Sequence, residues 1–140
     1  MALLSNKYNI SMWQGSTFGL TVAITHANNA PKNITGQNIR MQIRSSYDAT
    51  SVEETLTTET GEITITNGAN GTFQLELSAA RTANLEVDLS SLATVRISDT
   101  QTIKIPRAIY VYDLEIIDGA NVSKVMYGDV NVYGEVTRNG

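Results

Sequence analysis

The sequence predicts an all-β sandwich of about eight strands with one short helix. First, apolar and polar residues alternate along most of the chain, which is the pattern of strands with one buried face. Second, clusters of Gly, Asn, Asp and Pro separate the alternating runs, as turns do between short strands. Third, only one short segment has a helical pattern. We expect residues 1–140 to form a single domain, because a chain of this length buries roughly 68–70% of its unfolded surface.

The first third of the chain contains three alternating runs, at residues 7–12, 18–25 and 39–44. We expect their apolar residues to face the core: Tyr8, Ile10, Met12, Phe18, Leu20, Val22, Ile24, Ile39, Met41 and Ile43. Trp13 follows Met12 and therefore falls on the opposite face, where it is exposed and available to a partner.

The middle of the chain begins with a segment rich in Ser and Thr, residues 45–60. This composition indicates a loop with one short strand near Leu56. The neighbouring acidic residues Glu53 and Glu54 are expected in solvent within this loop. A loop calcium site there or at Asp118 is an unspecific alternative.

A hairpin and the helix are expected next. Ile63 and Ile65 lie on one arm, the turn is at residues 67–71, and Phe73, Leu75 and Leu77 lie on the other arm. Ser78 then fits an N-cap, because its hydroxyl can accept a hydrogen bond from the first turn of a helix. We expect that helix to run from Ala79 to Asn84.

Residues 86–107 indicate an additional, inserted β-hairpin. Val95 and Ile97 face Ile103 and Ile105 across a polar turn, and these four residues are candidate partner contacts together with Trp13. Pro106 is expected to end the second arm, because proline cannot donate a ladder hydrogen bond. A hairpin projecting alone is at best marginally stable, so we expect it to be mobile in the free subunit.

The last part of the chain predicts two long strands around a hairpin turn at Asp118 and Gly119. On the first strand the apolar residues expected to face inward are Tyr110, Tyr112, Leu114 and Ile116. The final strand is expected from about Val122 to Val132.

The composition argues against several classes of partner. Ten basic and fourteen acidic residues give a net charge of −4, which disfavours nucleic acid. No apolar run is long enough to span a bilayer, so no membrane partner is expected. Charged residues make up 17% of the chain, against roughly 25% in typical soluble domains. Depletion of charge is typical of surfaces that neighbouring subunits cover, and it also occurs in secreted β proteins.

The residues offer little for catalysis or for a cofactor. There is no Cys, and the single histidine, His26, lies beside a turn without partners at a suggestive spacing. Asp113 and Glu115 share one face of a strand, an arrangement that a glycosidase carboxylate pair can also have, but Arg40 and Arg44 are better explained as their cross-strand ion-pair partners. We therefore expect no enzymatic activity, no catalytic or metal-binding residues and no cofactor.

Several strings of residues, in order and over nearly the whole chain, resemble a family of small phage structural proteins encoded among tail and baseplate genes. The specific strings are RMQIRSS at residues 40–46 and YVYDLEI at 110–116; the supporting ones are QGSTF at 14–18, ITG at 34–36, TTE at 57–59, GEITI at 61–65, GTF at 71–73 and EVTR at 135–138. The chain is also similar to the N-terminal domain of siphophage upper-baseplate proteins. The resemblance implies an immunoglobulin-like β-sandwich incorporated into a virion. The inserted hairpin at 86–107 departs from the family pattern.

Three functions follow as hypotheses. The first is a tail, neck or baseplate adaptor that is made in the host cytoplasm and binds other virion structural proteins in multiple copies within a symmetric assembly. The second is a capsid decoration protein. The third is a carbohydrate-binding module at the host-contact end of the tail, which would need exposed aromatic residues such as Trp13.

Overall fold

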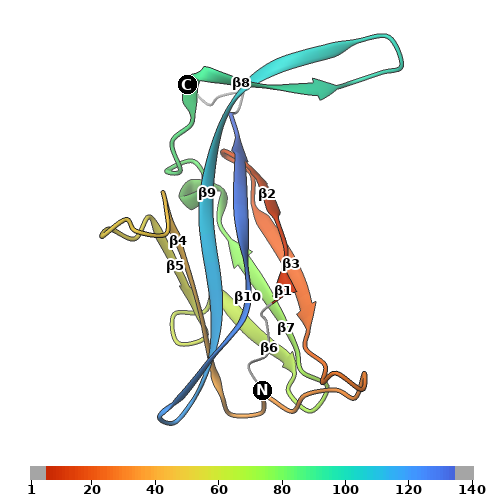
Figure 1. Cartoon of the computed structure of the whole chain (residues 1–140), viewed down its shortest axis with the longest axis vertical. Helices are drawn as coiled ribbons and strands as arrows, with labels where there is room; N and C mark the ends of the chain where they lie inside the picture. Colours follow the sequence, from red (N-terminus) through yellow and green to blue (C-terminus); the bar gives the residue numbers. More distant parts are fainter. Residues whose placement is uncertain (1–5, 135–140) are drawn as a thin grey trace.

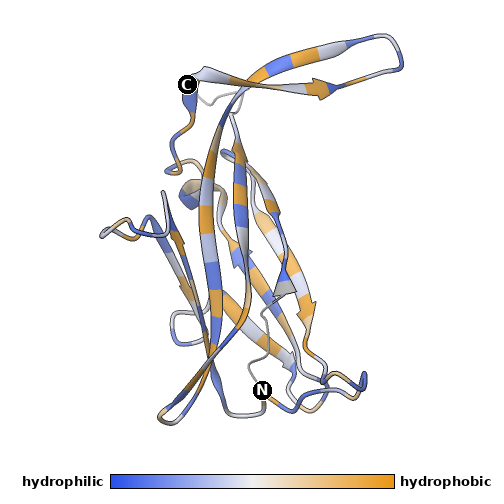
Figure 2. Cartoon of the chain, viewed as in Figure 1, coloured by the Kyte–Doolittle hydropathy of each residue, from blue (hydrophilic) through white to orange (hydrophobic). Residues whose placement is uncertain are grey.

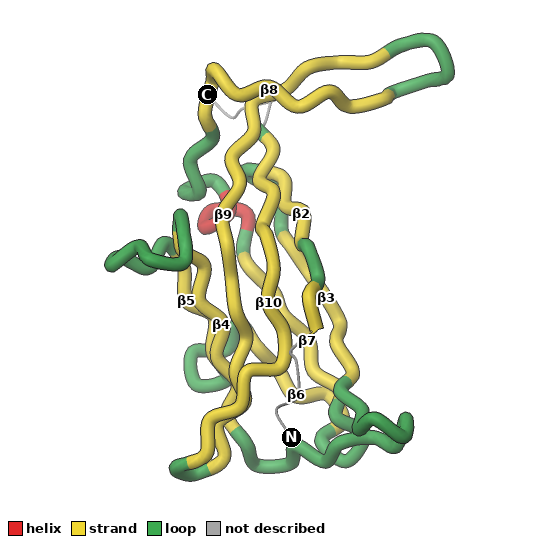
Figure 3. The backbone as a smooth tube through the Cα atoms, in the orientation of Figure 1, coloured by secondary structure: helices red, strands yellow, loops and turns green. Residues whose placement is uncertain are grey.

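The computed structural model describes residues 6–134, which form ten strands and one short helix in two sheets (Figures 1 and 3). The elements are β1 (Asn6–Lys7), β2 (Ile10–Trp13), β3 (Phe18–Ala23), β4 (Asn38–Arg44), β5 (Glu54–Thr57), β6 (Ile63–Asn67), β7 (Thr72–Leu77), α1 (Ala79–Thr82), β8 (Asp88–Arg96), β9 (Thr102–Asp118) and β10 (Asn121–Tyr133). The larger sheet has the order β1-β10-β9-β4-β5, with β2 also on β10 and β8 also on β9. The smaller sheet has the order β3-β7-β6. The predicted all-β sandwich is confirmed. The string EVTR at residues 135–138, which is part of the resemblance to phage proteins, lies outside the described residues.

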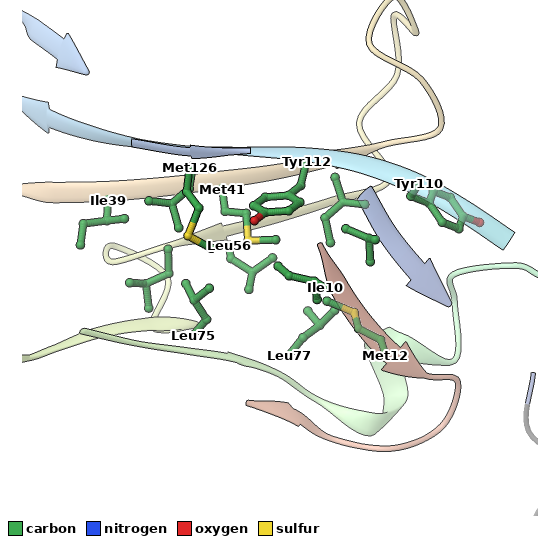
Figure 4. Packing of buried hydrophobic residues seen from close by; sticks show 14 of the residues in the cluster. Ile10, Met12, Ile39, Met41, Leu56, Leu75, Leu77, Tyr110, Tyr112 and Met126 are labelled. Carbon is green, nitrogen blue, oxygen red and sulfur yellow. The ribbon is translucent and has the colours of Figure 1, made fainter. Parts of the chain in front are cut away.

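The core lies between the two sheets, and alternation along each strand supplies it. On β4 the inward residues Ile39, Met41 and Ile43 are fully buried, as predicted. Ile39 and Met41 lie across the sandwich from Leu75 and Leu77 of the smaller sheet (Figure 4). A buried side chain of this size contributes about 1.5–3 kcal/mol.

The two predicted hairpins at 63–77 and at 118–119 are confirmed. Ile63 pairs with Leu75 and Ile65 with Phe73, so β6 and β7 present one apolar face. At the second turn Gly119 has a φ of +60°, a left-handed conformation that glycine adopts without strain. Asn121 then pairs with Asp118 to start β10.

The predicted end of a strand at Pro106 is wrong, because β9 runs through it for 17 residues. The same strand pairs with β8 at its beginning and with β10 and β4 further along. Pro106 is tolerated because it lies opposite a bulge in β8, between Asp88 and Leu92, where the ladder is already interrupted. Its carbonyl oxygen accepts a hydrogen bond of 2.7 Å from the Gly134 N–H. The hairpin is therefore continuous with a central strand of the sandwich.

The N-terminal run pairs with β10 in parallel, in two pieces. Ile10 and Met12 are buried as predicted, but Tyr8 is exposed instead of facing the core. Tyr8 lies in the break between β1 and β2, where the alternation of faces is interrupted. Its backbone N–H still donates to the Tyr127 carbonyl at 2.8 Å, which keeps the segment on β10.

The predicted helix is confirmed but ends earlier, at Thr82. The Ser78 side chain caps it by accepting a hydrogen bond from the Arg81 N–H. The Arg81 guanidinium bonds the carboxylates of Glu54, at 2.5 Å, and of Glu62, at 2.8 Å. The prediction that Glu54 lies in a solvated loop is therefore wrong: it begins β5 and forms an ion pair with the helix.

Candidate docking surface

The inserted hairpin projects from one end of the sandwich (Figure 1). Its arms are β8 and the first residues of β9, so the predicted hairpin is confirmed; Val95 pairs with Ile103, whereas Ile97 lies at the turn and does not pair with either isoleucine of the second arm. One step nearer the sandwich, Ala93 pairs with Ile105. At the tip, the Ile97 N–H donates to the Gln101 carbonyl at 3.0 Å and closes the turn.

Directly paired residues point to the same side of a hairpin, and so do residues two apart along a strand. One side therefore carries five apolar residues, with Gln101 opposite Ile97 at the tip, and we call these five the hairpin face: Ala93, Val95, Ile97, Ile103 and Ile105. Figure 2 shows the alternating apolar and polar bands along the arms. The opposite side carries Thr94, Arg96, Thr102 and Lys104 toward the tip.

Burial of the hairpin face decreases toward its tip. Ile105 is only 3% exposed and Ala93 is also buried, whereas Ile103 is 40% and Ile97 55% exposed. Val95 is half-buried. Ile105 thus supports the base of the hairpin and is not a free contact, contrary to the sequence-based prediction. The surface that a partner can reach is formed by Val95, Ile97 and Ile103.

Trp13 is 46% exposed, as predicted from its place opposite Met12. Its ring packs against that of Tyr133, with centroids 5.2 Å apart and planes tilted by 35°. Tyr133 lies opposite Arg107, the residue after Pro106, so this aromatic pair sits at the base of the hairpin. We call Trp13, Tyr133 and the exposed Ile109 the base patch.

Sequence reasoning missed Ile109 and Tyr133 as surface residues. The signal was present, because each of them directly adjoins a buried residue, Tyr110 or Val132. The alternation of side chains along a strand therefore places both on the outer face of the sheet. Sequence reasoning also missed Leu89 and Leu92 of β8, which are exposed. Leu92 lies at the β8 bulge, opposite Pro106, and no local sequence signal revealed that irregularity.

The remaining candidate residues are spread over the molecule. His26 is exposed in the turn beside the Thr25–Pro31 bridge. Arg40 pairs with Glu115 at 2.8 Å, as predicted, whereas Asp113 pairs with Lys124 at 3.2 Å and not with an arginine.

A search for three or more His, Cys, Asp or Glu side chains able to share a metal ion finds no such group within residues 6–134. Over the same range, no helix has the length and apolarity needed to cross a membrane.

Comparison with models of known protein families finds no match to this chain, and comparison with curated protein sequences finds no significant one.

Proposed function

We propose that this chain is a structural, non-enzymatic component of a phage virion. It acts as a tail, neck or baseplate adaptor and docks on neighbouring virion proteins through the hairpin face and the base patch. The observation that carries the proposal is the projecting hairpin, which holds branched apolar side chains in solvent. Exposed apolar side chains on a projecting element are typical of a surface that is covered in an assembly.

The continuity of β9 supports a load-transmitting role. A partner bound at Ile103 contacts the same strand whose inward residues Tyr112 and Leu114 are part of the core. Force on the hairpin is therefore passed along backbone hydrogen bonds into the larger sheet. The resemblance of residues 40–46 and 110–116 to phage tail and baseplate proteins supports the same role.

The hairpin also indicates the chemistry of the partner. The hairpin face requires an apolar groove, while Arg96 and Lys104 on the opposite side favour an acidic rim. Residues 88–107 carry three basic and two acidic side chains within a chain whose net charge is −4. A neighbouring virion protein with an acidic surface around an apolar groove fits this arrangement.

The first test is the copy number of the chain per purified virion, measured by quantitative mass spectrometry against the major capsid protein. A small copy number matching the symmetry of a tail or baseplate supports the adaptor role. A copy number comparable to that of the capsid protein would instead assign the chain to the head as a decoration protein. Absence from the particle would refute a virion role altogether.

The second test locates the contact. Ile97→Ser and Ile103→Ser together should abolish incorporation into particles while leaving the isolated domain folded, because both side chains are exposed. Val122→Ser is a matched control, since Val122 is also 55% exposed but lies in the strand that leaves the Gly119 turn. Normal incorporation of the hairpin variant would contradict docking through the hairpin face.

A further inference from the structure

A pocket of about 260 Å³ lies on the outer face of the larger sheet, away from the hairpin. Its floor is formed by outward side chains of β4 and β9, which alternate with the buried core residues. One wall comes from the loop that joins β4 to β5 and protrudes beside the sheet (Figure 3). The residues that matter for binding are Gln42, Arg44, Tyr47, Asp113 and Glu115.

The polar groups of the pocket hold one another in place, and Arg40 supports them from outside the lining. Arg44 donates to the Ala49 carbonyl at 2.9 Å and to the Gln42 Oε1 at 3.1 Å. Arg40 binds one oxygen of Glu115 at 2.8 Å. These contacts use the Gln42 Oε1 and one Glu115 oxygen, while the Gln42 amide N–H groups and the other Glu115 oxygen also belong to residues that line the pocket. A bound molecule would thus find fixed donors and acceptors.

Tyr47 adds an aromatic surface to this polar floor. Its side chain is 63% exposed, and its hydroxyl has no hydrogen-bond partner within the described range. Partial burial and then the nearby Asp129 carboxylate raise the pKa of Tyr47, so the hydroxyl stays protonated at neutral pH. The ring can stack on an apolar ligand face while the hydroxyl donates a hydrogen bond.

Charged side chains of both signs line the pocket. Glu115 is paired with Arg40 and Asp113 with Lys124, and Arg44 also lines the pocket, so a cationic ligand would meet these cations. An anionic ligand would face both carboxylates. The pocket therefore suits a neutral molecule rich in hydroxyl groups.

We propose that this pocket binds one neutral hexopyranose ring, with the Tyr47 ring against its C–H face and the amide and carboxylate groups on its hydroxyls. The volume is just below the roughly 300–1,000 Å³ of pockets that enclose drug-sized molecules, which limits the site to a single ring. A ligand this small in an open pocket should bind with a millimolar dissociation constant. The site is independent of the proposed docking surface, and its test uses the isolated chain.

The test is a titration of the ¹⁵N-labelled chain with D-glucose, D-galactose and D-mannose, followed by amide chemical shifts. At least one sugar should produce saturable shifts at Gln42, Arg44 and Tyr47. Glucuronate and glucosamine, which carry opposite charges, should bind more weakly than the best neutral sugar. The absence of saturable shifts with every neutral hexose would refute the proposal, as would tighter binding of either charged sugar.

Variants of Tyr47 test whether its ring stacks on the sugar. Tyr47→Ala should weaken the binding by about tenfold, whereas Tyr47→Phe should stay within about twofold because it keeps the ring. Tyr8→Ala removes an exposed aromatic ring outside the pocket and should leave the affinity unchanged. Equal affinity of the wild-type chain and Tyr47→Ala, or a loss of affinity in Tyr8→Ala, would overturn the assignment.

Discussion

The Tyr112 hydroxyl donates a hydrogen bond of 2.6 Å to the backbone carbonyl oxygen of Tyr8. These residues are 104 positions apart, and the bond falls in the break between β1 and β2. Burial raises the pKa of Tyr112, so the hydroxyl remains protonated and able to donate. The contact joins the N-terminal segment to the central strand β9 at the point where its ladder with β10 is interrupted.

Replacement of this hydroxyl should weaken the fold without removing the ring. Tyr112→Phe is expected to lower the free energy of unfolding by about 1–2 kcal/mol, because the Tyr8 carbonyl loses its side-chain donor. Urea denaturation followed by tryptophan fluorescence measures the difference. Tyr47→Phe is the control, with an expected change below about 0.5 kcal/mol, because the Tyr47 hydroxyl has no hydrogen-bond partner in the described part of the chain. Equal effects in the two variants would show that the Tyr112 bond contributes nothing specific.

The same junction requires a glycine on β10. A Cβ atom at Gly128 would lie 2.4 Å from the Tyr8 carbonyl oxygen. Gly128→Ala should therefore cost about 2 kcal/mol, as the backbone of one strand must shift. Gly119→Ala meets no atom within 4 Å but has a φ of +60°, and it should cost about 1 kcal/mol from backbone strain alone. Thermal unfolding compares the two variants, and a larger effect at Gly119 would contradict the steric explanation.

The sequence predicted those elements whose burial follows local alternation. Ile39, Met41 and Ile43, the 63–77 hairpin and the Ser78 cap were all visible in the order of residues. Tyr8 was misplaced because its environment depends on parallel pairing with β10, more than a hundred residues away.

The errors at Pro106 and Glu54 have the same origin. A bulge in β8 lets Pro106 lie inside β9. Glu54 is held by an ion pair with Arg81, and β6 and β7 lie between these two residues in the sequence. Neither partner is marked by spacing in the sequence. In the docking surface, alternation placed Val95 and Ile103 on one side of the hairpin but could not show that Ile105 is covered.

The Arg81 ion pairs are expected to stabilise the fold more than the exposed pairs do. Arg81→Ala leaves the carboxylates of Glu54 and Glu62 partly buried without their cation, and it also removes a 2.9 Å bond to the Thr55 carbonyl. We expect a loss of about 2 kcal/mol, between the values for exposed and buried pairs.

Arg96→Ala provides the control for Arg81→Ala. It breaks a solvent-exposed pair with Asp99 and should change stability by less than about 0.5 kcal/mol. Guanidinium chloride would screen both pairs, so urea denaturation is the measurement to use. A loss for Arg81→Ala no larger than that for Arg96→Ala would refute the prediction.

Glu62 should make stability depend on acid pH. Partial burial alone raises the pKa of Glu62, but hydrogen bonds from Thr60, the Thr57 N–H and Arg81 outweigh it and hold the pKa below the ordinary value of 4.5. Because the folded-state pKa is lowered, the ionised carboxylate stabilises the fold above pH 4.5, and this contribution is lost as pH falls through the lowered value.

Glu62→Gln tests that dependence, since an amide does not ionise. The variant should be less stable than the wild-type chain at pH 7, and the difference should shrink as the pH falls below 4.5. Urea denaturation over a series of pH values gives the two curves. Glu76→Gln, at an exposed position on β7, should follow the wild-type curve closely. A constant gap between the wild-type chain and Glu62→Gln at all pH values would contradict the assigned role.

Rates of amide hydrogen exchange should decrease along β9 from the tip of the hairpin into the sandwich. The stretch from Val111 to Ile116 is flanked by β4 and β10, whereas residues 102–106 pair only with β8 among the described strands. A two-stranded arm opens more easily than a strand inside a sheet. Amides paired between β8 and β9 should exchange fastest near Arg96 and Thr102, more slowly at Ala93 and Ile105, and slowest beyond Tyr110. Exchange measured by mass spectrometry on the isolated chain gives these rates, and uniform strong protection up to Thr102 would mean that the hairpin is rigid before it meets a partner.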